Sequence, residues 1–289
     1  MSEFEDKVVI ITGAGGGIGK AHALEYGRRG AKVVVNDLGG SVDGAGEGDA
    51  ADRVVDAIRK AGGTAIANKA SVSDRDGAKS IVEDAVREFG TVDILVNNAG
   101  ILRDKSFRKM TLDEWDLVVA VHLNGSAYVT HAAWQIMYEK NYGRIVLTSS
   151  GSGIWGNFGQ ANYGAAKMGM IGMMNVLALE GASHNIRVNC LAPGAATRMT
   201  ATIPGREFDP ENPPAQSAPS LVTPAVLYMT SEDAPSGACI QAAGGRYSSA
   251  AMYSNEGTTL GPDADFESFL DNLTPITDMT AATQGRQAR

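Results

Sequence analysis

The stretch TGAGGGIG, Thr12 to Gly19, decides the fold of this chain. It follows the apolar run KVVIIT (7–12) and precedes a segment with a helical pattern, 18–30. Glycines at a strand-to-helix turn permit positive φ angles and let a pyrophosphate approach the backbone at the helix N-terminus. Many glycine-rich turns are only tight turns, so the rest of the chain must supply the context.

Short β-branched runs alternate with helical patterns as far as about residue 242, and the runs are apolar almost throughout. Continuous apolar runs predict strands that are buried on both faces of a parallel sheet. The alternation predicts an α/β fold with a doubly wound sheet of about seven strands and helices on both faces. The predicted strands are 7–12, 32–37, 64–68, 92–97, 144–149, 186–192 and 238–242, and the helices include 18–30, 50–62, 74–89, 111–139 and 160–181.

The chain contains no internal repeat and no stretch typical of an interdomain linker. We therefore predict one domain over residues 1–261 that carries both the cofactor site and the catalytic site. Segment 203–220 is rich in proline and polar residues, which is typical of a loop. We expect it to belong to a substrate loop at about 198–220. The extension 262–289 is polar with few apolar residues, and the sequence leaves its structure open.

Composition restricts the class of protein. The chain has 289 residues, 44% of them hydrophobic, which is enough for a full core, and its net charge of −8 argues against nucleic acid or anionic membranes as partners. Its two cysteines, Cys190 and Cys239, have no metal-ligand spacing, so we expect neither a metal site nor a disulfide framework. The N-terminal residues are acidic, whereas a signal peptide begins with basic residues. No apolar run has membrane-spanning length, and the final GRQAR matches no peroxisomal targeting signal. These features predict a cytoplasmic protein.

Two further motifs follow predicted strands. Asp37 ends the second strand, 18 residues after Gly19. A carboxylate there accepts hydrogen bonds from ribose hydroxyls and repels a 2′-phosphate, which favours NAD over NADP, although Asp37 could instead cap the adjacent glycine turn. NNAG, Asn97 to Gly100, ends the fourth strand. Buried amides must form hydrogen bonds with all their donors and acceptors. NNAG therefore indicates a segment that hydrogen bonds hold in place as one wall of the cofactor site, with a plain turn as the alternative.

A third group of residues carries acid–base chemistry. Tyr163 and Lys167 are four residues apart in a predicted helix, so they share one face. A fixed cation beside a phenol lowers the phenol pKa from its ordinary value of about 10. Ser150 follows the fifth strand, where side chains face the ligand crevice. Asn124 lies in the middle of helix 111–139, and a poor helix former at that position indicates a functional site or a kinked helix.

These motifs together resemble the classical short-chain dehydrogenase/reductase family over residues 7 to about 245. The resemblance implies a Rossmann-type fold and hydride transfer between a nicotinamide ring and a carbonyl carbon. It implies that Tyr163 is the general acid/base and that Lys167 lowers its pKa and binds the nicotinamide ribose. By the same resemblance, Ser150 holds the substrate oxygen and Asn124 holds a water that relays protons from Lys167.

The resemblance also implies a set of cofactor contacts. This sequence departs from the family pattern in two places. Ala70 and Ser71 stand where an adenine-binding aspartate is common. Thr197 lies one residue early, so either Thr197 or Thr200 could contact the nicotinamide carboxamide. The implied contacts to NAD are Gly13, Gly17, Ile18, Gly19, Asp37, Ser71, Val72, Asn98, Ala99, Gly100, Tyr163, Lys167, Pro193, Gly194 and Thr197.

VNDLGG, NNAGILRD, VHLNGS and SGIWGNFGQANY resemble more closely the (3R)-hydroxyacyl-CoA dehydrogenase part of the peroxisomal multifunctional enzymes type 2. This resemblance implies a (3R)-3-hydroxyacyl-CoA substrate. A steroid-like or other hydrophobic secondary alcohol is the alternative, and a non-catalytic nucleotide-binding protein is a remote one. The basic stretch ILRDKSFRKMT (101–111) could anchor CoA phosphates. The expected substrate contacts are Arg103, Arg108, Ser150 and Gln160.

Segment 163–182 predicts the association state. It is apolar or small almost all round, so a helix there needs cover on two sides. One side packs on the sheet and a partner subunit covers the other, which indicates a homodimer or homotetramer. The alternative cover is the chain's own C-terminal segment.

Overall fold

The computed structural model describes residues 2–40, 46, 48–201, 205 and 207–285. The chain divides into two compact units, Met1–Ser249 and Ala250–Arg289. Parts of the predicted substrate loop (202–204 and 206) and the end of the predicted extension (286–289) lie outside the described residues. The predicted domain 1–261 stays a prediction from the sequence.

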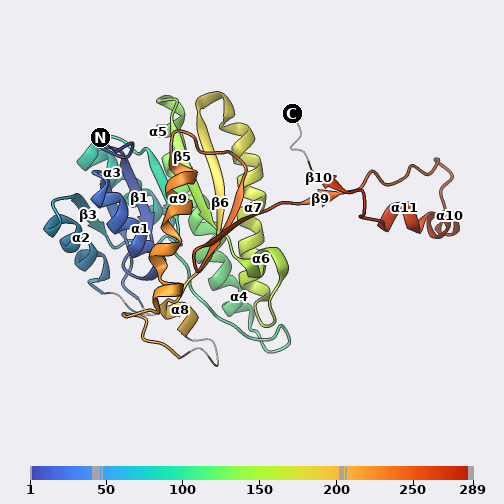
Figure 1. Cartoon of the computed structure of the whole chain (residues 1–289), viewed down its shortest axis with the longest axis horizontal. Helices are drawn as coiled ribbons and strands as arrows, with labels where there is room; N and C mark the ends of the chain where they lie inside the picture. Colours follow the sequence, from blue (N-terminus) through green and yellow to red (C-terminus); the bar gives the residue numbers. More distant parts are fainter. Residues whose placement is uncertain (1, 41–45, 47, 202–204, 206, 286–289) are drawn as a thin grey trace. The chain divides into compact units, whose positions relative to one another are not determined.

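The first unit contains an eight-stranded sheet, which Figure 1 shows among its helices. Seven strands pair in parallel, as the apolar runs predict. The sheet order is β3 (Thr64–Asn68), β2 (Lys32–Asn36), β1 (Val8–Thr12), β4 (Ile94–Asn97), β5 (Gly143–Thr148), β6 (Ile186–Gly194), β7 (Cys239–Ala243) and β8 (Arg246–Ala250). The predicted doubly wound Rossmann-type fold is confirmed.

Strand β8 is an addition to the predicted set. Gly244 and Gly245 join it to β7, and both have positive φ, 55° and 77°. Two consecutive positive φ angles are what a two-residue hairpin turn requires, and glycine meets that requirement without strain. The sequence RYSSA of β8 is polar and mostly exposed, so it lacks the apolar pattern by which the other strands were predicted.

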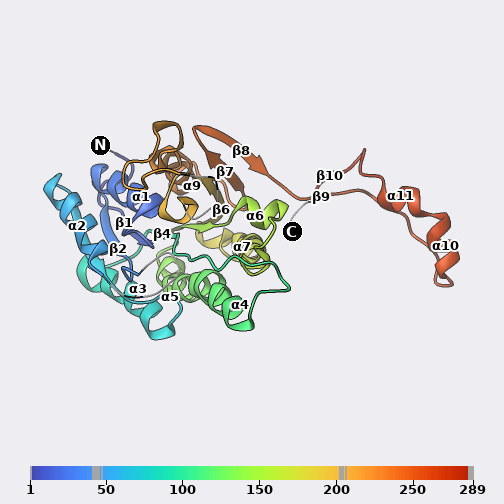
Figure 2. The same cartoon turned by 90° about the horizontal axis from the view of Figure 1, so that it is seen from below.

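Helices cover both faces of the sheet (Figure 2). Helices α1 (Gly17–Arg28), α2 (Ala50–Lys60) and α9 (Thr223–Thr230) form one layer. The other layer contains α3 (Arg75–Phe89), α4 (Leu112–Val119), α5 (Gly125–Glu139) and α7 (Ala161–Glu180). Strands β1, β4 and β5 are buried along their whole length, which explains why their sequences are apolar at consecutive positions. The chain order reverses between β1 and β4, and ligands bind at such a switch point.

The single helix predicted over 111–139 is interrupted. A capping box between Thr111 and Glu114 starts α4, and a π-helical turn, Ala120–Asn124, joins it to α5. The conflict that Asn124 and Gly125 create in the helical pattern therefore coincides with a real break in the α-helix. Single π-turns inside helices are frequent at functional sites.

The second unit, Ala250–Arg289, has little regular structure among its described residues. Strands β9 (Tyr253–Ser254) and β10 (Thr283–Gln284) pair antiparallel, and α10 (Phe266–Asp271) and α11 (Leu273–Thr277) lie between them in the sequence. None of residues 250–285 is buried. The polar composition of the predicted extension accounts for the absence of a core among these residues.

Candidate active site

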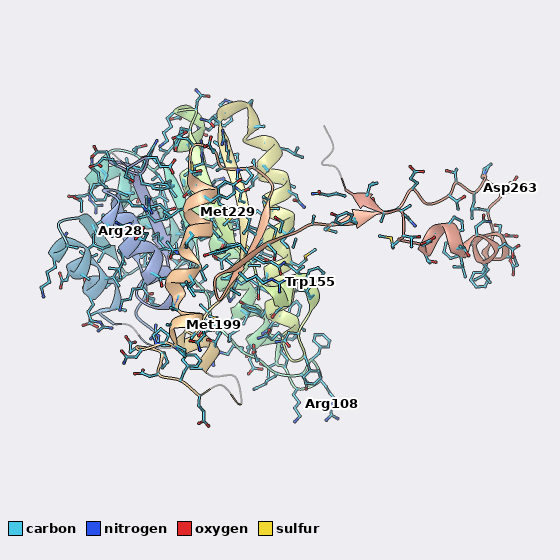
Figure 3. The ribbon with its side chains drawn as sticks, in the orientation of Figure 1. Arg28, Arg108, Trp155, Met199, Met229 and Asp263 are labelled. Carbon is cyan, nitrogen blue, oxygen red and sulfur yellow. The ribbon has the colours of Figure 1, made fainter. Side chains whose placement is uncertain are left out.

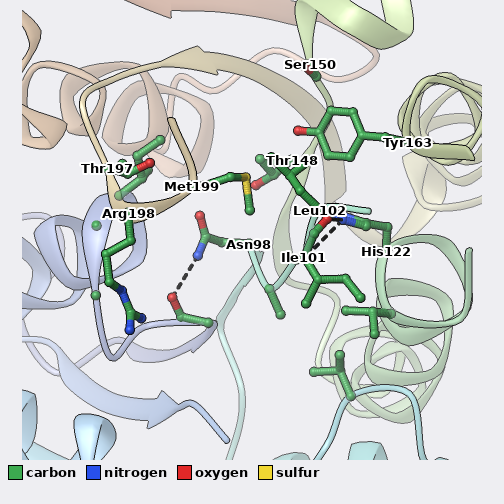
Figure 4. Close-up of a pocket in the computed structure, with 18 of the residues that line it drawn as sticks. Asn98, Ile101, Leu102, His122, Thr148, Ser150, Tyr163, Thr197, Arg198 and Met199 are labelled. Carbon is green, nitrogen blue, oxygen red and sulfur yellow. Dashed lines mark hydrogen bonds between the residues drawn. The ribbon is translucent and has the colours of Figure 1, made fainter. Parts of the chain in front are cut away.

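A cavity of about 400 Å³ opens at the carboxyl ends of β1, β2, β4, β5 and β6. Every predicted cofactor residue except Gly19 lines it, as do Ser150 and Gln160. Short helices α6 (Gly151–Trp155) and α8 (Arg198–Ala201) begin at its edge. Figure 4 shows part of this pocket, with Tyr163 and Ser150 on one side and Arg198 on the other.

The glycine turn between β1 and α1 requires glycine at specific positions. Gly13 and Gly17 have φ of 64° and 51°, in the left-handed region that other residues rarely adopt. Gly19 faces inward, because a Cβ there would lie 2.3 Å from the carbonyl oxygen of Gly13. Gly19 therefore permits the packing of α1 on the turn, and the other two glycines shape the pocket itself.

Asp37 bonds to the backbone of both adjacent turns and lines the pocket. One carboxylate oxygen accepts a hydrogen bond from the backbone N–H of Gly15 at 2.8 Å, and the other accepts from Gly39 at 2.7 Å. The carboxylate thus caps the following turn, and it also lines the pocket. Each oxygen of a carboxylate has two lone pairs, so both can still accept from a ligand hydroxyl.

The NNAG segment is pinned to the glycine turn. The side-chain amide of Asn98 donates to the carbonyl oxygens of Thr12 and Gly13, both at 3.0 Å. The hydroxyl of Thr12 accepts from the backbone N–H groups of Asn98 and Ala99. This cross-linking holds the ends of β1 and β4 together as one wall of the pocket.

Tyr163 and Lys167 lie on α7 and face the end of β5. The ammonium of Lys167 is 3% exposed and donates to the carbonyl oxygen of Thr148 at 2.5 Å. It lies 5.5 Å from the centre of the Tyr163 ring. Ser150 is the N-cap residue of α6 and accepts from the backbone N–H of Ser152 at 3.2 Å. The pocket therefore brings the hydroxyl, the phenol and the ammonium together.

Burial controls the acid–base properties of this group. It lowers the pKa of Lys167 to about 7. It also raises the pKa of Tyr163, an effect that the hydroxyl of Ser150 opposes. The sequence predicted a lowered phenol pKa, but in the free chain the desolvation of the phenol is the larger effect and the ammonium bonds to Thr148 instead. Two desolvated groups with raised and lowered pKa values are typical of acid–base sites.

His122 lines the pocket, and sequence reasoning did not select it. The side chain is 1% exposed, and its Nε2 lies 2.8 Å from the carbonyl oxygen and 3.1 Å from the nitrogen of Ile101. Its ring meets Tyr163 edge to face, with centroids 5.1 Å apart (Figure 4). Burial and the nearby Lys167 hold the pKa of His122 well below its usual range, so the ring is neutral.

A signal for His122 exists in the sequence. His122, Ser126 and Thr130 are spaced four residues apart and all are buried, so they form a polar stripe on the inner face of the π-turn and α5. Buried polar residues in such a stripe require partners inside the protein. His122 also explains Gly100, because a Cβ at that position would lie 2.2 Å from Cε1 of the imidazole.

Besides Gly19, three predicted site residues do not line this pocket. Asn124 lies at the end of the π-turn, where it is exposed, so the structure does not bring it to Tyr163 and Lys167. Arg108 is also exposed and projects outward (Figure 3), and Arg103 is partly buried. Gln160 does line the pocket, with its amide nitrogen donating to Asp104 at 2.6 Å.

The pair of candidate carboxamide ligands can be distinguished by geometry. The hydroxyl of Thr200 donates to the carbonyl oxygen of Ala195 at 2.9 Å, so its proton is used within the chain. The methyl group of Thr197 lies over Gly17, at 3.1 Å from the position of a Cβ on that glycine. Both threonines line the pocket, and among the described residues the hydroxyl of Thr197 has only one possible acceptor, the more distant Oγ1 of Thr200 at 3.4 Å.

The fold and this pocket define a Rossmann-type oxidoreductase that acts on a CH–OH group. The chain belongs to the short-chain dehydrogenase family, whose pattern matches residues 7–207. Members of this family use a nicotinamide dinucleotide, NAD or NADP.

Relatives of two kinds match the chain. Peroxisomal multifunctional enzyme A of Dictyostelium discoideum is 55% identical over 231 residues, which are 80% of this chain and 51% of that protein. This chain thus spans about half the length of that relative. A short-chain type dehydrogenase/reductase of Mycobacterium tuberculosis is 45% identical over 284 residues, 98% of each chain.

Two solved structures are similar over nearly the whole chain. The full-length peroxisomal multifunctional enzyme type 2 from Drosophila melanogaster has a TM-score of 0.79 and 39% identity, covering 98% of this chain and 47% of its own. A short chain dehydrogenase from Mycobacterium avium has a TM-score of 0.82 and 39% identity, covering 96% of this chain and 98% of its own. The resemblance to the dehydrogenase family and to multifunctional enzymes type 2 is therefore confirmed.

No described helix has the length and apolar character needed to cross a membrane. Across the same part of the chain, no three His, Cys, Asp or Glu side chains gather in a way that could hold a metal ion.

Proposed function

We propose that this protein is an NAD-dependent dehydrogenase that interconverts (3R)-3-hydroxyacyl-CoA and 3-ketoacyl-CoA. The observation that carries the proposal is the convergence of Ser150, Tyr163 and Lys167 in the same pocket as the glycine turn and Asp37. The similarity to multifunctional enzymes supports the substrate class, because the sequence resembles the (3R)-hydroxyacyl-CoA dehydrogenase part of those of type 2.

The residues that line the pocket fit a dinucleotide. A Cβ on Gly15 would lie 2.8 Å from the carboxylate of Asp37, so glycine at this position lets the turn pack against that carboxylate. The N-cap of α1 is Gly16, which has no side chain to satisfy the N–H groups of the first turn, and that turn contains no acidic residue. Free N–H groups at a helix N-terminus favour a diphosphate. Thr197 is our choice for the carboxamide contact.

In the mechanism that we propose, Ser150 and Tyr163 hold the substrate hydroxyl. Tyr163 in its phenolate form takes the hydroxyl proton, and Ser150 donates a hydrogen bond to the developing carbonyl oxygen. Lys167 stabilises the phenolate when its amine is protonated. When bound, NAD supplies the hydride acceptor at its nicotinamide ring. For Asn124 we keep only the alternative, a residue at the break in the helix, because it is exposed and does not line the pocket.

Asp37 should determine the choice of cofactor. In the Asp37→Asn variant the negative charge is removed but one acceptor oxygen remains, so repulsion of a 2′-phosphate falls. We expect the ratio of kcat/KM for NAD to that for NADP to fall by about tenfold or more. Asp56→Asn, an exposed change on α2, is the control and should leave the ratio unchanged. A wild-type preference for NADP would show that the role given to Asp37 is wrong.

A steroid-like or other hydrophobic secondary alcohol is the second candidate substrate. The lining includes Ile101, Leu102 and Met199, which would suit an apolar substrate as well as an acyl chain. We propose that Arg103 and Arg108 contact the CoA phosphates from outside the pocket. NADH formation with a panel of hydroxyacyl-CoA esters and steroid alcohols separates the two candidates. A non-catalytic nucleotide-binding protein is disfavoured, because nucleotide binding alone does not require Ser150 and Tyr163.

We also propose that the protein is a homodimer or homotetramer. Met168, Val176 and Leu179 of α7 are 37%, 53% and 44% exposed and share one face with Gly172. A partner subunit would remove this apolar stripe from water. Light scattering at micromolar concentration should give at least twice the mass of one chain, and Val176→Glu should lower it. A monomeric mass for the wild type would contradict the proposal. The cytoplasmic location stays a prediction.

A further inference from the structure

Arg198 lies over the glycine turn from across the pocket. It is the first residue of α8, and its Nη2 atom is 3.2 Å from the position that a Cβ on Gly16 would occupy. The side chain lines the pocket, opposite Tyr163 and Ser150 in Figure 4. A Cβ at position 16 would therefore crowd the guanidinium, which would have to shift by a few tenths of an ångström.

The charges that line the pocket are few. Among the described residues, the lining contains the cations Lys167 and Arg198 and the carboxylate of Asp37. The ammonium of Lys167 already bonds to Thr148. Within the same part of the chain, the guanidinium of Arg198 has no ion pair or side-chain hydrogen bond. Among the described residues it is thus an unpaired cation, and the first turn of the adjacent helix α1 contains no acidic residue.

The order of charges along the turn matches one part of a dinucleotide. The carboxylate of Asp37 stands beside Gly15, and the guanidinium of Arg198 stands beside Gly16. A carboxylate suits ribose hydroxyls, and a guanidinium suits phosphate oxygens, which it can bind with two parallel hydrogen bonds. In a dinucleotide the diphosphate follows the adenosine ribose directly.

We propose that Arg198 binds the diphosphate of the cofactor and holds it against the N-terminus of α1. This inference rests on the proposed function, because it requires a dinucleotide in the pocket. The binding energy comes from a cation that has no ion pair with any other described residue, so none of the described ion pairs has to break. Arg198 could instead bind the 2′-phosphate of NADP. Asp37 and Arg198 lie beside the neighbouring glycines Gly15 and Gly16, so a group on the adenosine ribose is also close to Arg198.

Calorimetric titration with adenosine fragments tests the inference without any turnover. The probes are adenosine, ADP and adenosine 2′,5′-bisphosphate, each titrated into the wild type, Arg198→Ala and Arg198→Lys. We expect Arg198→Ala to weaken ADP binding about 10- to 100-fold and to change adenosine binding by less than about threefold. The ADP affinity of Arg198→Lys should lie between those of the wild type and Arg198→Ala. An ammonium keeps the positive charge but cannot form the two parallel hydrogen bonds of a guanidinium. Added salt should reduce the difference.

Arg246→Ala is the matched control, because Arg246 is an exposed arginine of β8 that does not line the pocket. It should bind ADP like the wild type. Equal ADP affinity in Arg198→Ala and the wild type would overturn the inference and leave the proposed function intact. A loss confined to the 2′,5′-bisphosphate would also overturn it, in favour of 2′-phosphate recognition. If the wild type binds neither ADP nor NADH, the proposed cofactor is wrong. The role of Arg198 would then be contradicted as well, because it requires a dinucleotide in the pocket.

Discussion

Replacing Tyr163 by Phe should lower kcat by about 10²- to 10⁴-fold and leave the dissociation constant of NADH nearly unchanged. The substitution removes only the hydroxyl that exchanges a proton with the substrate. The ring remains, and with it the edge-to-face contact to His122 at 5.1 Å. Steady-state NADH formation measures the first quantity, and fluorescence titration with NADH measures the second.

Tyr228→Phe makes the same chemical change at an exposed position of α9 and should have no effect on kcat. The pH dependence gives a second criterion. Burial raises the pKa of Tyr163 above its ordinary value, so kcat/KM for alcohol oxidation should climb with pH into the alkaline range. The residual kcat/KM of Tyr163→Phe should not show this increase with pH. A variant that retains more than about half of the wild-type kcat would remove Tyr163 from the mechanism.

Lys167→Met should lower kcat by about 10²-fold or more and change the pH dependence of stability. The folded protein holds the pKa of Lys167 at about 7, whereas the unfolded chain has the ordinary value of 10.5. The unfolded state therefore binds the extra proton between these values, and wild-type stability rises with pH across that window. Methionine has similar length and no charge, so the variant lacks this rise.

The measurement for Lys167→Met is the thermal midpoint of both proteins from about pH 6 to about pH 10. The difference, variant minus wild type, should be most positive below pH 7 and fall as the pH increases. Loss of the hydrogen bond to Thr148 opposes the gain at every pH, but it does not reverse the trend. A difference that grows with pH would mean that Lys167 is not desolvated as the structure indicates.

The sequence predicts most of this fold because its signals are local. Seven strands carry continuous apolar runs, and each predicted strand overlaps an observed one. The eighth, β8, has the polar sequence RYSSA at the sheet edge, so only the Gly244–Gly245 turn could have indicated it. The sequence predicts one continuous helix over 111–139 and misses the π-turn. A change in hydrogen-bond register inside a helix alters the pattern of apolar residues only slightly.

The site separates into a part that spacing determines and a part that packing determines. Tyr163 and Lys167 follow from their four-residue spacing, and Asp37 from its distance to the glycine turn. His122 depends on contact with Ile101, 21 residues away, and on the π-turn that directs it inward. The sequence identified the irregularity but selected Asn124, which the same turn leaves exposed.

Long-range burial also accounts for the pKa of Tyr163. Spacing alone places a cation near the phenol and predicts a lower pKa. The structure adds the desolvation of the phenol, which raises its pKa, and a carbonyl oxygen to which Lys167 donates a hydrogen bond. The position of Arg198 over Gly16 likewise brings together residues 182 positions apart. No local pattern contains that contact.

The most direct test of the central claim is NADH formation from the two enantiomers of one 3-hydroxyacyl-CoA. With NAD present, the wild-type protein should form NADH from the (3R) ester, and the (3S) ester should react at least about 100-fold more slowly, because one pocket wall carries Ser150 and Tyr163 and fixes the face that reacts. NADP in place of NAD should lower the rate. Tyr163→Phe should abolish the signal and so excludes a contaminating activity. Turnover of a CoA-free secondary alcohol with no NADH from either ester, or equal rates for both enantiomers, would contradict the account.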